Sequence, residues 1–350
     1  QTQNGELSTH YHKIHAKHAE IENTLIQLGT QALPKDTSEI TLDFDATDDL
    51  IHGQQEGRYF HGYYHNYCYL PLYAFVDDIP FYAKLRICDR DACDGTVEAL
   101  ESIVPQLRAR FPQARIIVRG DSGFAREAIM RWCEDHGCYY CLGMAKNARL
   151  KKLLEPAMIK ARETACLTGG FACRFNGFRY QTTKSWSRSR RLIGTAQIIR
   201  GKENPRFIVT NLPEDHWPEE EPHTTDITDL SPEGIYRHFY CARGDMENRI
   251  KEQQLDMFAD RTSSAAMASN QLRLWFSTIA YLLVQQLRTH ALAGTKLAKV
   301  TAGTIRQRLL KVAASIRVSA RRVHARICSN FVLRRLFEQA HDRIRSLPEL

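Results

Sequence analysis

The chain has 350 residues, of which 43% are hydrophobic and 25% are charged. This composition is ordinary for a folded chain that buries one or two cores, and it argues against intrinsic disorder. The formal net charge of +8 suits a polyanionic partner without identifying one. Because no run of eighteen apolar residues is present, we expect no membrane-spanning helix.

The first predicted strand carries its acids on one face. Three apolar residues alternate with three polar ones, and this period of two is typical of a strand with one buried face: Ile40, Leu42 and Phe44 on one side, Thr41, Asp43 and Asp45 on the other. A Gly- and aromatic-rich stretch, His52 to Tyr69, follows. Two further apolar runs over 67–76 and 81–87 then predict a β-hairpin.

The next elements alternate between helix and strand. We predict a helix over 96–110, a buried strand over 115–121 that ends on Asp121, a helix over 124–136 and a strand over 138–144. Three strands followed by helix, strand, helix and strand is the order of the ribonuclease-H-like fold. We therefore predict an α/β protein with a mixed sheet flanked by helices, whose first part covers residues 38–168.

The second half changes character twice. Short aromatic and β-branched runs over 169–212 predict a β-rich insertion, and residues 213–233 hold eight acids and no Lys or Arg, which predicts an acidic connector over 213–230. Ser231 and Pro232 then predict the start of a helix, within a segment 231–262. Residues 301–335 contain nine basic residues and no acid, so we expect a basic helical region over 263–350.

Two groups of possible metal ligands have simpler interpretations. Cys138 and Cys141 have the spacing of a zinc half-site, but no matching second pair follows, and buried strand cysteines are favoured over a zinc site. We interpret the ten cysteines as reduced thiols of a cytosolic protein. Four histidines in a helical N-terminal segment over 1–37 are interpreted as a solvated helix face: His10, His12, His15 and His18.

Three acids stand out as a possible catalytic set: Asp45, Asp121 and Glu247. Phosphodiester chemistry is well served by two divalent ions, one activating the nucleophile and one stabilising the leaving oxygen. Carboxylates are the hard oxygen ligands that suit Mg²⁺. Taken singly, each acid has a structural explanation as a turn former or a solvated helix residue. Their combination in this fold order favours the catalytic interpretation.

The helix around Glu247 supplies the strongest local pattern. Tyr240, Arg243, Glu247 and Lys251 are separated by three, four and four residues, so they fall within a helical stripe of roughly 80°. Arg can hold a phosphate with two hydrogen bonds while Glu holds a metal ion. A ladder of salt bridges along the helix is the structural alternative.

These motifs resemble those of DDE transposases from bacterial insertion sequences. The residues Tyr240, Arg243 and Glu247 match the spacing of the Tyr-Arg-Glu-Lys signature, and Asp45-Ala-Thr47 and Gly-Asp121-Ser-Gly-Phe124 resemble the two aspartate motifs. The run 52–58 and the block 240–252 further resemble insertion-sequence family thirteen-eighty. The resemblance extends from about residue 40 to residue 345.

The resemblance implies an enzyme, a DNA transposase with endonuclease and strand-transfer activity. It implies that Asp45, Asp121 and Glu247 are ligands of two Mg²⁺ or Mn²⁺ ions. The expected substrate is double-stranded DNA, which a homodimer transposes by cut-and-paste. The expected location is the bacterial cytoplasm, in association with the nucleoid when the protein is bound to DNA. Family members carry a DNA-binding region before the first aspartate. Because the chain begins with Gln1 and about forty residues precede Asp45, we expect this region to be missing or reduced.

Two positions of the motif have more than one candidate residue. The signature Lys falls on Gln254, so Lys251 is the candidate to take its place at the phosphate, and Asp43 is an alternative first ligand because it shares a strand face with Asp45. Rival interpretations of the whole chain are a catalytically silent DNA-binding relative and a nuclease on the same fold.

Further DNA contacts are expected outside the acid set. The β-rich insertion suggests a hairpin intermediate in which a flipped base stacks on an aromatic ring. Trp186, flanked by Arg188 and Arg190, is the candidate ring, and a surface turn with a solvated basic tip is the alternative. In the basic C-terminal region we expect Arg321 and Arg322 to contact phosphates.

Overall fold

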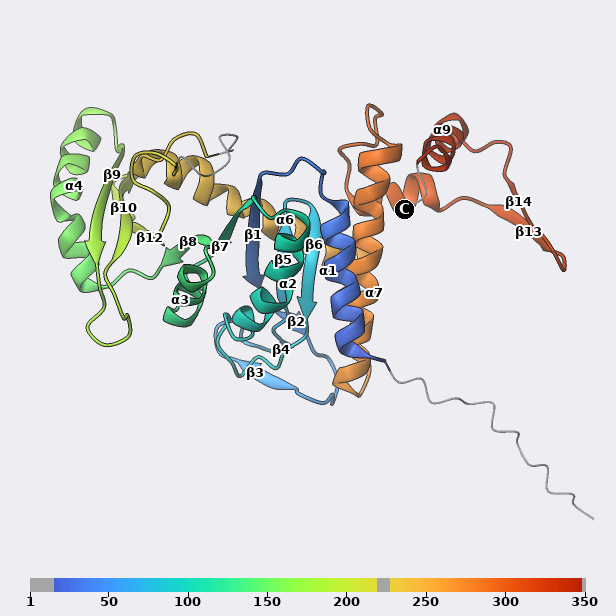
Figure 1. The fold of residues 1–350 in the computed structure, drawn as a ribbon, viewed down its shortest axis with the longest axis horizontal. Helices are drawn as coiled ribbons and strands as arrows, with labels where there is room; N and C mark the ends of the chain where they lie inside the picture. The colour runs from blue at the N-terminus through green and yellow to red at the C-terminus, as the bar shows by residue number, and fades with distance from the viewer. Residues whose placement is uncertain (1–15, 219–226, 348–350) are drawn as a thin grey trace, which may run out of the picture.

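The computed structural model describes residues 16–218 and 227–347 of the chain. Its central feature is one mixed sheet in the order β11-β10-β12-β8-β7-β1-β5-β6, with β9 paired to β10, which extends along an elongated molecule (Figure 1). The strands are β1 (Glu39–Ala46), β5 (Leu72–Val76), β6 (Ile79–Lys84), β7 (Arg115–Gly120), β8 (Tyr139–Met144), β9 (Phe171–Tyr180), β10 (Arg190–Ile199), β11 (Lys202–Glu203) and β12 (Arg206–Thr210).

The middle of this sheet has the connectivity that the sequence predicts. β5 and β6 run antiparallel to their neighbours, whereas β1, β7 and β8 are parallel to one another. Phe44 of β1 lies opposite Gly120 of β7. The residues that follow these two positions, Asp45 and Asp121, therefore lie side by side at the same edge of the sheet.

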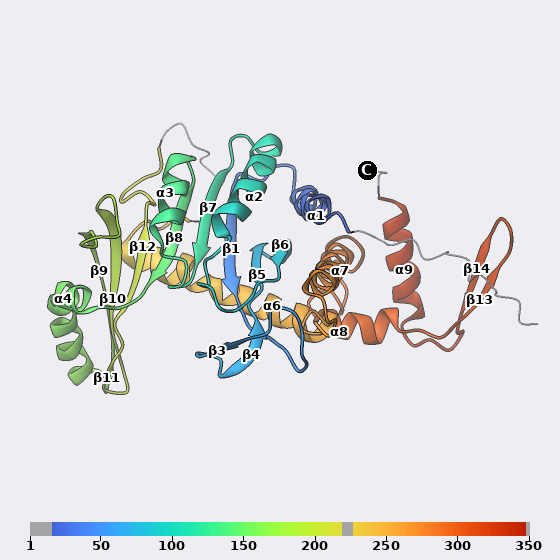
Figure 2. The same cartoon turned by 90° about the horizontal axis from the view of Figure 1, so that it is seen from below.

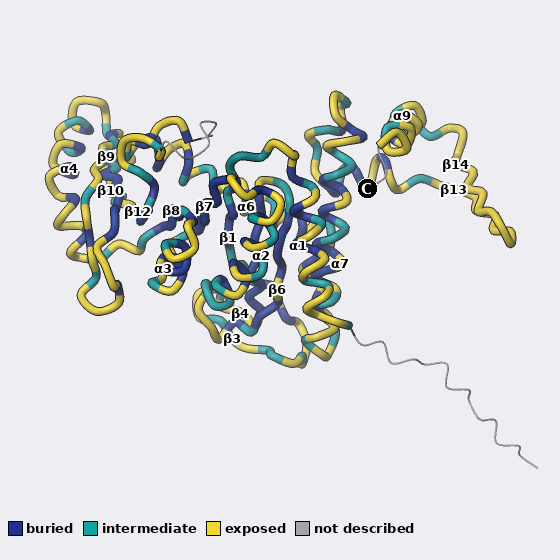
Figure 3. Tube along the Cα trace, in the orientation of Figure 1, coloured by how far each residue is buried: buried dark blue, intermediate teal, exposed yellow. Residues whose placement is uncertain are grey.

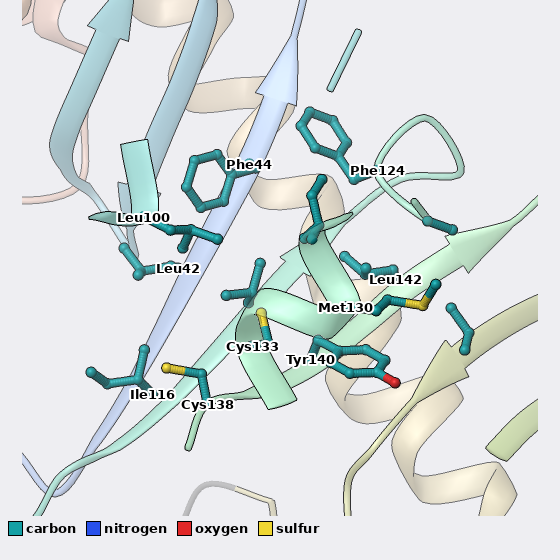
Figure 4. Close-up of a cluster of buried hydrophobic side chains, with 14 of the residues drawn as sticks. Leu42, Phe44, Leu100, Ile116, Phe124, Met130, Cys133, Cys138, Tyr140 and Leu142 are labelled. Carbon is teal, nitrogen blue, oxygen red and sulfur yellow. The ribbon is translucent and has the colours of Figure 1, made fainter. Parts of the chain in front are cut away.

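Four helices cover one face of the sheet: α1 (His18–Ala32), α2 (Thr96–Arg110), α3 (Glu127–Asp135) and α4 (Ala148–Leu167). The buried core lies beneath them, where Leu42 and Phe44 of β1 meet Leu100 of α2 and Phe124 before α3 (Figure 4). The alternating pattern of β1 thus places its apolar side chains inward, as predicted. Burial follows the sheet and its covering helices through the centre of the molecule (Figure 3).

The opposite face is covered by the helical segment that carries Glu247 (Figure 2). This segment consists of α5 (Pro232–Gly234), the π-helical turn η1 (Ile235–Tyr240), the 3₁₀ turn η2 (Cys241–Arg243) and α6 (Gly244–Met257), and α7 (Met267–Gln286) packs beside it. Ser231 caps its start by accepting a hydrogen bond from the Gly234 amide at 3.1 Å. The predicted helix is therefore present, but π and 3₁₀ turns interrupt it before Glu247.

Residues 169–212 do not form a separate unit. β12 pairs with β8, and β10 pairs with both β9 and β12, so these strands extend the central sheet instead of standing apart from it. The backbone groups of β12 and β10 are satisfied by ladder hydrogen bonds to a strand on each side. Only local runs were visible in the sequence, and the pairing partner was not.

The expectation of an all-helical C-terminal region is wrong for residues 314–327. There β13 (Ala314–Val318) and β14 (Val323–Ile327) form an antiparallel hairpin that projects from the end of the molecule (Figure 1). Apolar and polar residues alternate with period two in both strands, which favours strand over helix. The rest of the region is helical, with η3 (Leu287–Ala291), α8 (Ala302–Ile305), η4 (Arg306–Leu310) and α9 (Arg334–Arg345).

A small second sheet lies beside the carboxyl ends of β1 and β7. It pairs β2 (Asp49–Leu50), β4 (Asn66–Tyr69) and β3 (Tyr59–His61) in the order β2-β4-β3. The predicted run over 67–76 is thus two strands, β4 and β5, separated by residues 70 and 71. This sheet takes up most of the Gly- and aromatic-rich stretch.

The possible zinc ligands are separated by the fold. Cys138 packs in the core beneath α3, whereas Cys141 belongs to a buried cluster on the opposite face of the sheet. Among the residues that the structure describes, no group of three His, Cys, Asp or Glu side chains is arranged to hold an ion. His10, His12 and His15 lie outside the described residues. In the described part, no helix is long and apolar enough to cross a bilayer.

Candidate active site

Two aspartates are placed at one sheet edge by adjacent parallel strands. Asp45 is next to last in β1, and Asp121 directly follows β7. Each carboxylate is anchored by a nearby backbone amide: Ala46 N–H donates to Asp45 Oδ1 at 2.9 Å, and Gly123 N–H donates to Asp121 Oδ1 at 2.8 Å. These hydrogen bonds hold the side chains in defined positions before any ligand arrives.

Glu247 reaches the same place from the other face of the sheet. It lies in the first turn of α6, directly after the 3₁₀ turn η2. Arg243 stands between the acids: its Nη2 donates to Glu247 Oε1 at 3.1 Å, and its Nη1 lies 3.9 Å from Asp45 Oδ2. The guanidinium group therefore bridges two of the three acids.

All three acids line one cavity of about 520 Å³. Arg243, Lys251 and Gln254 line it as well, so the helical stripe that the sequence predicts faces the cavity along most of its length. Sequence reasoning did not assign a role to four further lining residues: His61, Tyr63, Tyr64 and Ser122. The only sequence signal for His61, Tyr63 and Tyr64 is the aromatic-rich composition of the stretch 52–69.

The environment of Asp45 disfavours the charged form of its carboxyl group. Burial raises the pKa of Asp45 to about 7; Arg243 opposes this rise, while the negative charges of Asp121 and Glu247 add to it. Carboxylates that repel one another inside a partly buried site lose that repulsion when a cation enters. Arg243 provides part of this compensation in the structure.

Tyr240 is held close to Asp121 by a glycine in the neighbouring strand. A Cβ atom on Gly143 would lie 2.5 Å from Tyr240 Oη and 2.7 Å from the Ser122 nitrogen, so no larger residue fits without movement of one of them. Burial raises the pKa of Tyr240 to about 12. The phenol is therefore neutral and lies beside the backbone that follows Asp121, but Tyr240 is not among the residues that line the cavity.

Asp43 has a different environment from Asp45, although both lie on the same strand face. Arg119 binds both of its carboxylate oxygens, with Nε–Oδ1 and Nη2–Oδ2 distances of 2.5 and 2.7 Å, and both side chains are buried. The same guanidinium donates to the Phe239 carbonyl at 2.6 Å. This geometry favours Asp45 over Asp43 as the acid that faces the cavity.

The two candidates for the signature Lys position lie one helical turn apart. Lys251 and Gln254 both line the cavity, and Gln254 Nε2 also donates to the Asp48 carbonyl at 3.1 Å. The amide is thus engaged with the backbone, whereas Lys251 is an exposed cation on the same wall. This arrangement is compatible with Lys251 acting at a bound phosphate.

The structure does not place Trp186 where a base can reach it. The ring is only 6% exposed and packs edge-on against Tyr180 at a centroid distance of 5.7 Å. Arg190 is buried and ion-paired to Glu127 and Glu134 of α3 at 2.6 and 2.7 Å, and the more exposed Arg188 lies 3.4 Å from Glu134. This placement speaks against the stacking role that was expected of Trp186, because its aromatic ring completes the packing between strands and α3.

Arg321 and Arg322 lie far from the cavity along the molecule, in the exposed turn that joins β13 to β14. The turn is closed by the Ser319 amide, which donates to the Arg322 carbonyl at 2.8 Å. Both arginines are therefore available to a polyanion, but not at the acid cluster.

The fold and site define an α/β protein with three acids and an arginine in one cavity at the carboxyl ends of parallel strands. Over residues 5–349 the chain matches the family model described as Transposase DDE domain group 1. The match spans nearly the whole chain, so the protein belongs to the DDE transposase family, which implies a DNA-processing enzyme that uses divalent metal ions. No curated protein sequence matched it.

Proposed function

We propose that this protein is a transposase that cuts DNA at the ends of an insertion sequence. The freed 3′-OH then attacks a phosphodiester of target DNA or of the opposite strand, forming a new phosphodiester and displacing the 3′-oxygen of the attacked strand. The observation that carries this proposal is that Asp45, Asp121 and Glu247, which come from three distant parts of the chain, line one cavity. Their positions match the three acids of the resemblance. The catalytic core is proposed to be ribonuclease-H-like, supported by the strand order β6-β5-β1-β7-β8.

The side chains of the cavity have the chemistry that binds divalent cations, but in the structure Arg243 stands between Asp45 and Glu247 and the three acids are not gathered into an ion site. Carboxylate oxygens are hard donors. Burial raises the pKa of Asp45, repulsion from Asp121 and Glu247 adds to that rise, and a bound cation would relieve the repulsion. We propose that Asp45, Asp121 and Glu247 hold two Mg²⁺ or Mn²⁺ ions. Bound there, the ions would supply activation of the attacking hydroxyl and stabilisation of the leaving oxygen.

Arg243 and Tyr240 are proposed to orient the scissile phosphate. The guanidinium that bridges Asp45 and Glu247 is well placed to turn toward a phosphate once cations neutralise those acids, because guanidinium and phosphate match in geometry. The Tyr240 hydroxyl lies behind the cavity next to Gly143, where it can donate a hydrogen bond, so we propose that Tyr240 acts from behind the lining residues. Lys251 adds a positive charge on the same side.

The motifs also support a proposal about the branch of the family and the route of cleavage. We assign the chain to the Tyr-Arg-Glu-Lys branch and to insertion-sequence family thirteen-eighty on the motifs around Tyr240 and Glu247. A hairpin intermediate is retained as the cleavage route, with no role in it for Trp186.

The test is strand transfer by the purified chain. With Mg²⁺, we expect cleavage of a duplex that carries the end of the element, followed by joining of its 3′-OH to target DNA or to the opposite strand. A protein that binds this duplex and never cuts it would be the silent relative. A protein that cuts RNA and transfers no DNA end would be a nuclease, and the transposase proposal would fail.

The projecting hairpin is proposed to bind DNA backbone. Arg317 and His324 are directly opposite each other on one face, and Arg321 and Arg322 occupy the tip. Replacing both tip arginines by Ala should make the negative slope of log affinity against log salt shallower by about 2, roughly 0.9 for each lost phosphate contact. The matched control is Lys151→Ala with Lys152→Ala on α4, at the opposite end of the molecule (Figure 1). Equal slopes for the parent and the tip variant would contradict this role.

We further propose that two copies pair through the other face of this hairpin. Its members are apolar and lie opposite one another in register: Ala314, Ile316, Val318, Val323, Ala325 and Ile327. Ile316 and Val318 are 65% and 76% exposed, although apolar faces normally pack against something. Packing two such faces together would direct both sets of cations outward. We expect light scattering to give a dimer mass on DNA that Ile316→Asp reduces to a monomer mass; a monomer mass for the parent complex would refute the pairing.

A further inference from the structure

The small sheet β2-β4-β3 presents an unusual set of exposed aromatic side chains. Tyr59, Phe60, Tyr63 and Tyr67 are 52%, 48%, 81% and 40% exposed, within a stretch of nine residues. Burying an aromatic ring away from water is favourable. A cluster of solvent-exposed aromatic rings on one element therefore marks a binding surface. Neither the acid set nor the basic hairpin accounts for this cluster.

Tyr63 connects this surface to the active site. It lies in the turn between β3 and β4, and together with His61 and Tyr64 it lines the cavity that holds Asp45, Asp121 and Glu247. Its ring packs edge-on against Tyr64 at 5.1 Å, and Tyr64 in turn lies 4.9 Å from the His61 ring. The most exposed aromatic residue of the cluster therefore stands at the mouth of the acid cavity.

The turn that carries Tyr63 is braced. The Tyr63 amide donates to His61 Nδ1 at 3.3 Å, and Asn66 Nδ2 donates to the Tyr64 carbonyl at 3.1 Å. His65 adopts a left-handed conformation, with φ of 54°, which closes the four-residue connection. A ring presented by a braced turn loses little freedom when a ligand stacks on it.

The outer face of the same sheet continues the surface. Phe60 and Tyr67 are directly opposite in register, with their rings 5.5 Å apart, and the Arg58 guanidinium lies 3.4 Å from the centre of the Tyr67 ring. Aromatic rings next to a cation are the combination that binds unpaired nucleic acid, because bases stack on the rings while the cation meets phosphates. The bases of duplex DNA are already stacked on one another, so their faces cannot stack on these aromatic rings.

We propose that the β3–β4 turn is a stacking platform for an unpaired nucleobase next to the scissile phosphate, and that Tyr63 is the ring on which this base stacks. The proposal rests on the proposed function, since it needs a DNA strand in the acid cavity. It implies that the enzyme requires a few unpaired bases at the cleaved end.

The test measures binding in Ca²⁺ in place of Mg²⁺, so that a cation can neutralise the acids while strand cleavage is suppressed. Two DNA ligands are compared: a duplex with unpaired bases at the element end, and the same duplex with abasic sites in place of those bases. Tyr63→Ala should weaken binding to the first ligand about tenfold and leave binding to the second unchanged. Tyr63→Phe should match the parent on both. Phe171→Ala, which removes an exposed aromatic ring on β9, is the matched control and should have no effect.

A spectroscopic reading separates stacking from a structural role. Tyr63→Trp adds a fluorophore at an exposed position, and we expect the ligand with unpaired bases to quench the added emission more than the abasic ligand does. The proposal is overturned if Tyr63→Ala binds both ligands like the parent, or if it weakens both equally. A parent chain that shows the Tyr63 effect but never cleaves DNA in Mg²⁺ would refute the transposase function and leave the platform standing.

Discussion

Replacing Asp121 by Asn is expected to lower the rate of DNA cleavage by about 10³-fold, because a metal site contributes several kcal/mol to the transition state and each 1.4 kcal/mol is tenfold in rate. The amide has the shape of the carboxylate, and its oxygen can still accept the hydrogen bond from Gly123 N–H. Only the negative charge is lost. Cleavage of an end duplex in Mg²⁺ measures the rate, and calorimetry with Mn²⁺ measures the expected loss of cation affinity.

The matched control for this variant is Asp245→Asn. Asp245 lies two residues before Glu247 in α6, but it lines a neighbouring cavity together with Asp43 and Arg119. We expect this variant to cut DNA at nearly the parent rate. Cleavage by Asp121→Asn at the parent rate, or an equal loss in both variants, would exclude Asp121 from the catalytic set. Thermal unfolding of all three proteins shows whether the fold is retained.

Replacing Arg119 by Met is expected to lower the free energy of unfolding by about 3–5 kcal/mol, the usual cost of leaving one partner of a buried ion pair unpaired. Burial raises the pKa of Asp43, and the hydrogen bonds and charge of Arg119 oppose that rise. Without the guanidinium group, the Asp43 carboxylate and the Phe239 carbonyl both lose their partner. Urea denaturation at neutral pH measures the loss.

Two further variants identify the cause of that loss. Asp43→Asn together with Arg119→Met should recover part of the stability, because the double variant buries no unpaired charge. Arg90→Ala breaks an ion pair to Asp94 in which both side chains are largely exposed, and it should cost at most about 1 kcal/mol. If Arg119→Met cost no more than Arg90→Ala, the buried pair would have no special role in stability.

The two expected results together distinguish neighbouring acids on one strand. Asp45 faces the cavity and is proposed to act in catalysis, whereas Asp43 is engaged by Arg119 and is expected to act in folding. Substitution of Asp43 should therefore reduce the amount of folded protein more than the activity of each folded molecule.

Much of the central architecture was predictable from local patterns. The alternation around Phe44 correctly predicted which face of β1 is buried, and the order of strands and helices from 39 to 144 correctly predicted a mixed sheet flanked by helices. The spacing from Arg243 to Lys251 also predicted that these residues share one helix face, and they line one cavity. Such features depend on residues close in the chain, whose periodicity is set by the geometry of helix and strand.

The remaining features were decided by contacts between distant segments. Arg119 pairs with Asp43 across 76 residues, β12 pairs with β8, and Trp186 packs against Tyr180 instead of facing solvent. A sequence shows that a residue is charged, aromatic or β-forming, but burial and partner depend on which segments fold together. The three acids show both the reach and the limit of the sequence. Their residue types and motifs were visible in the chain. Only the tertiary structure brought Asp45, Asp121 and Glu247 to one cavity with Tyr63 at its mouth.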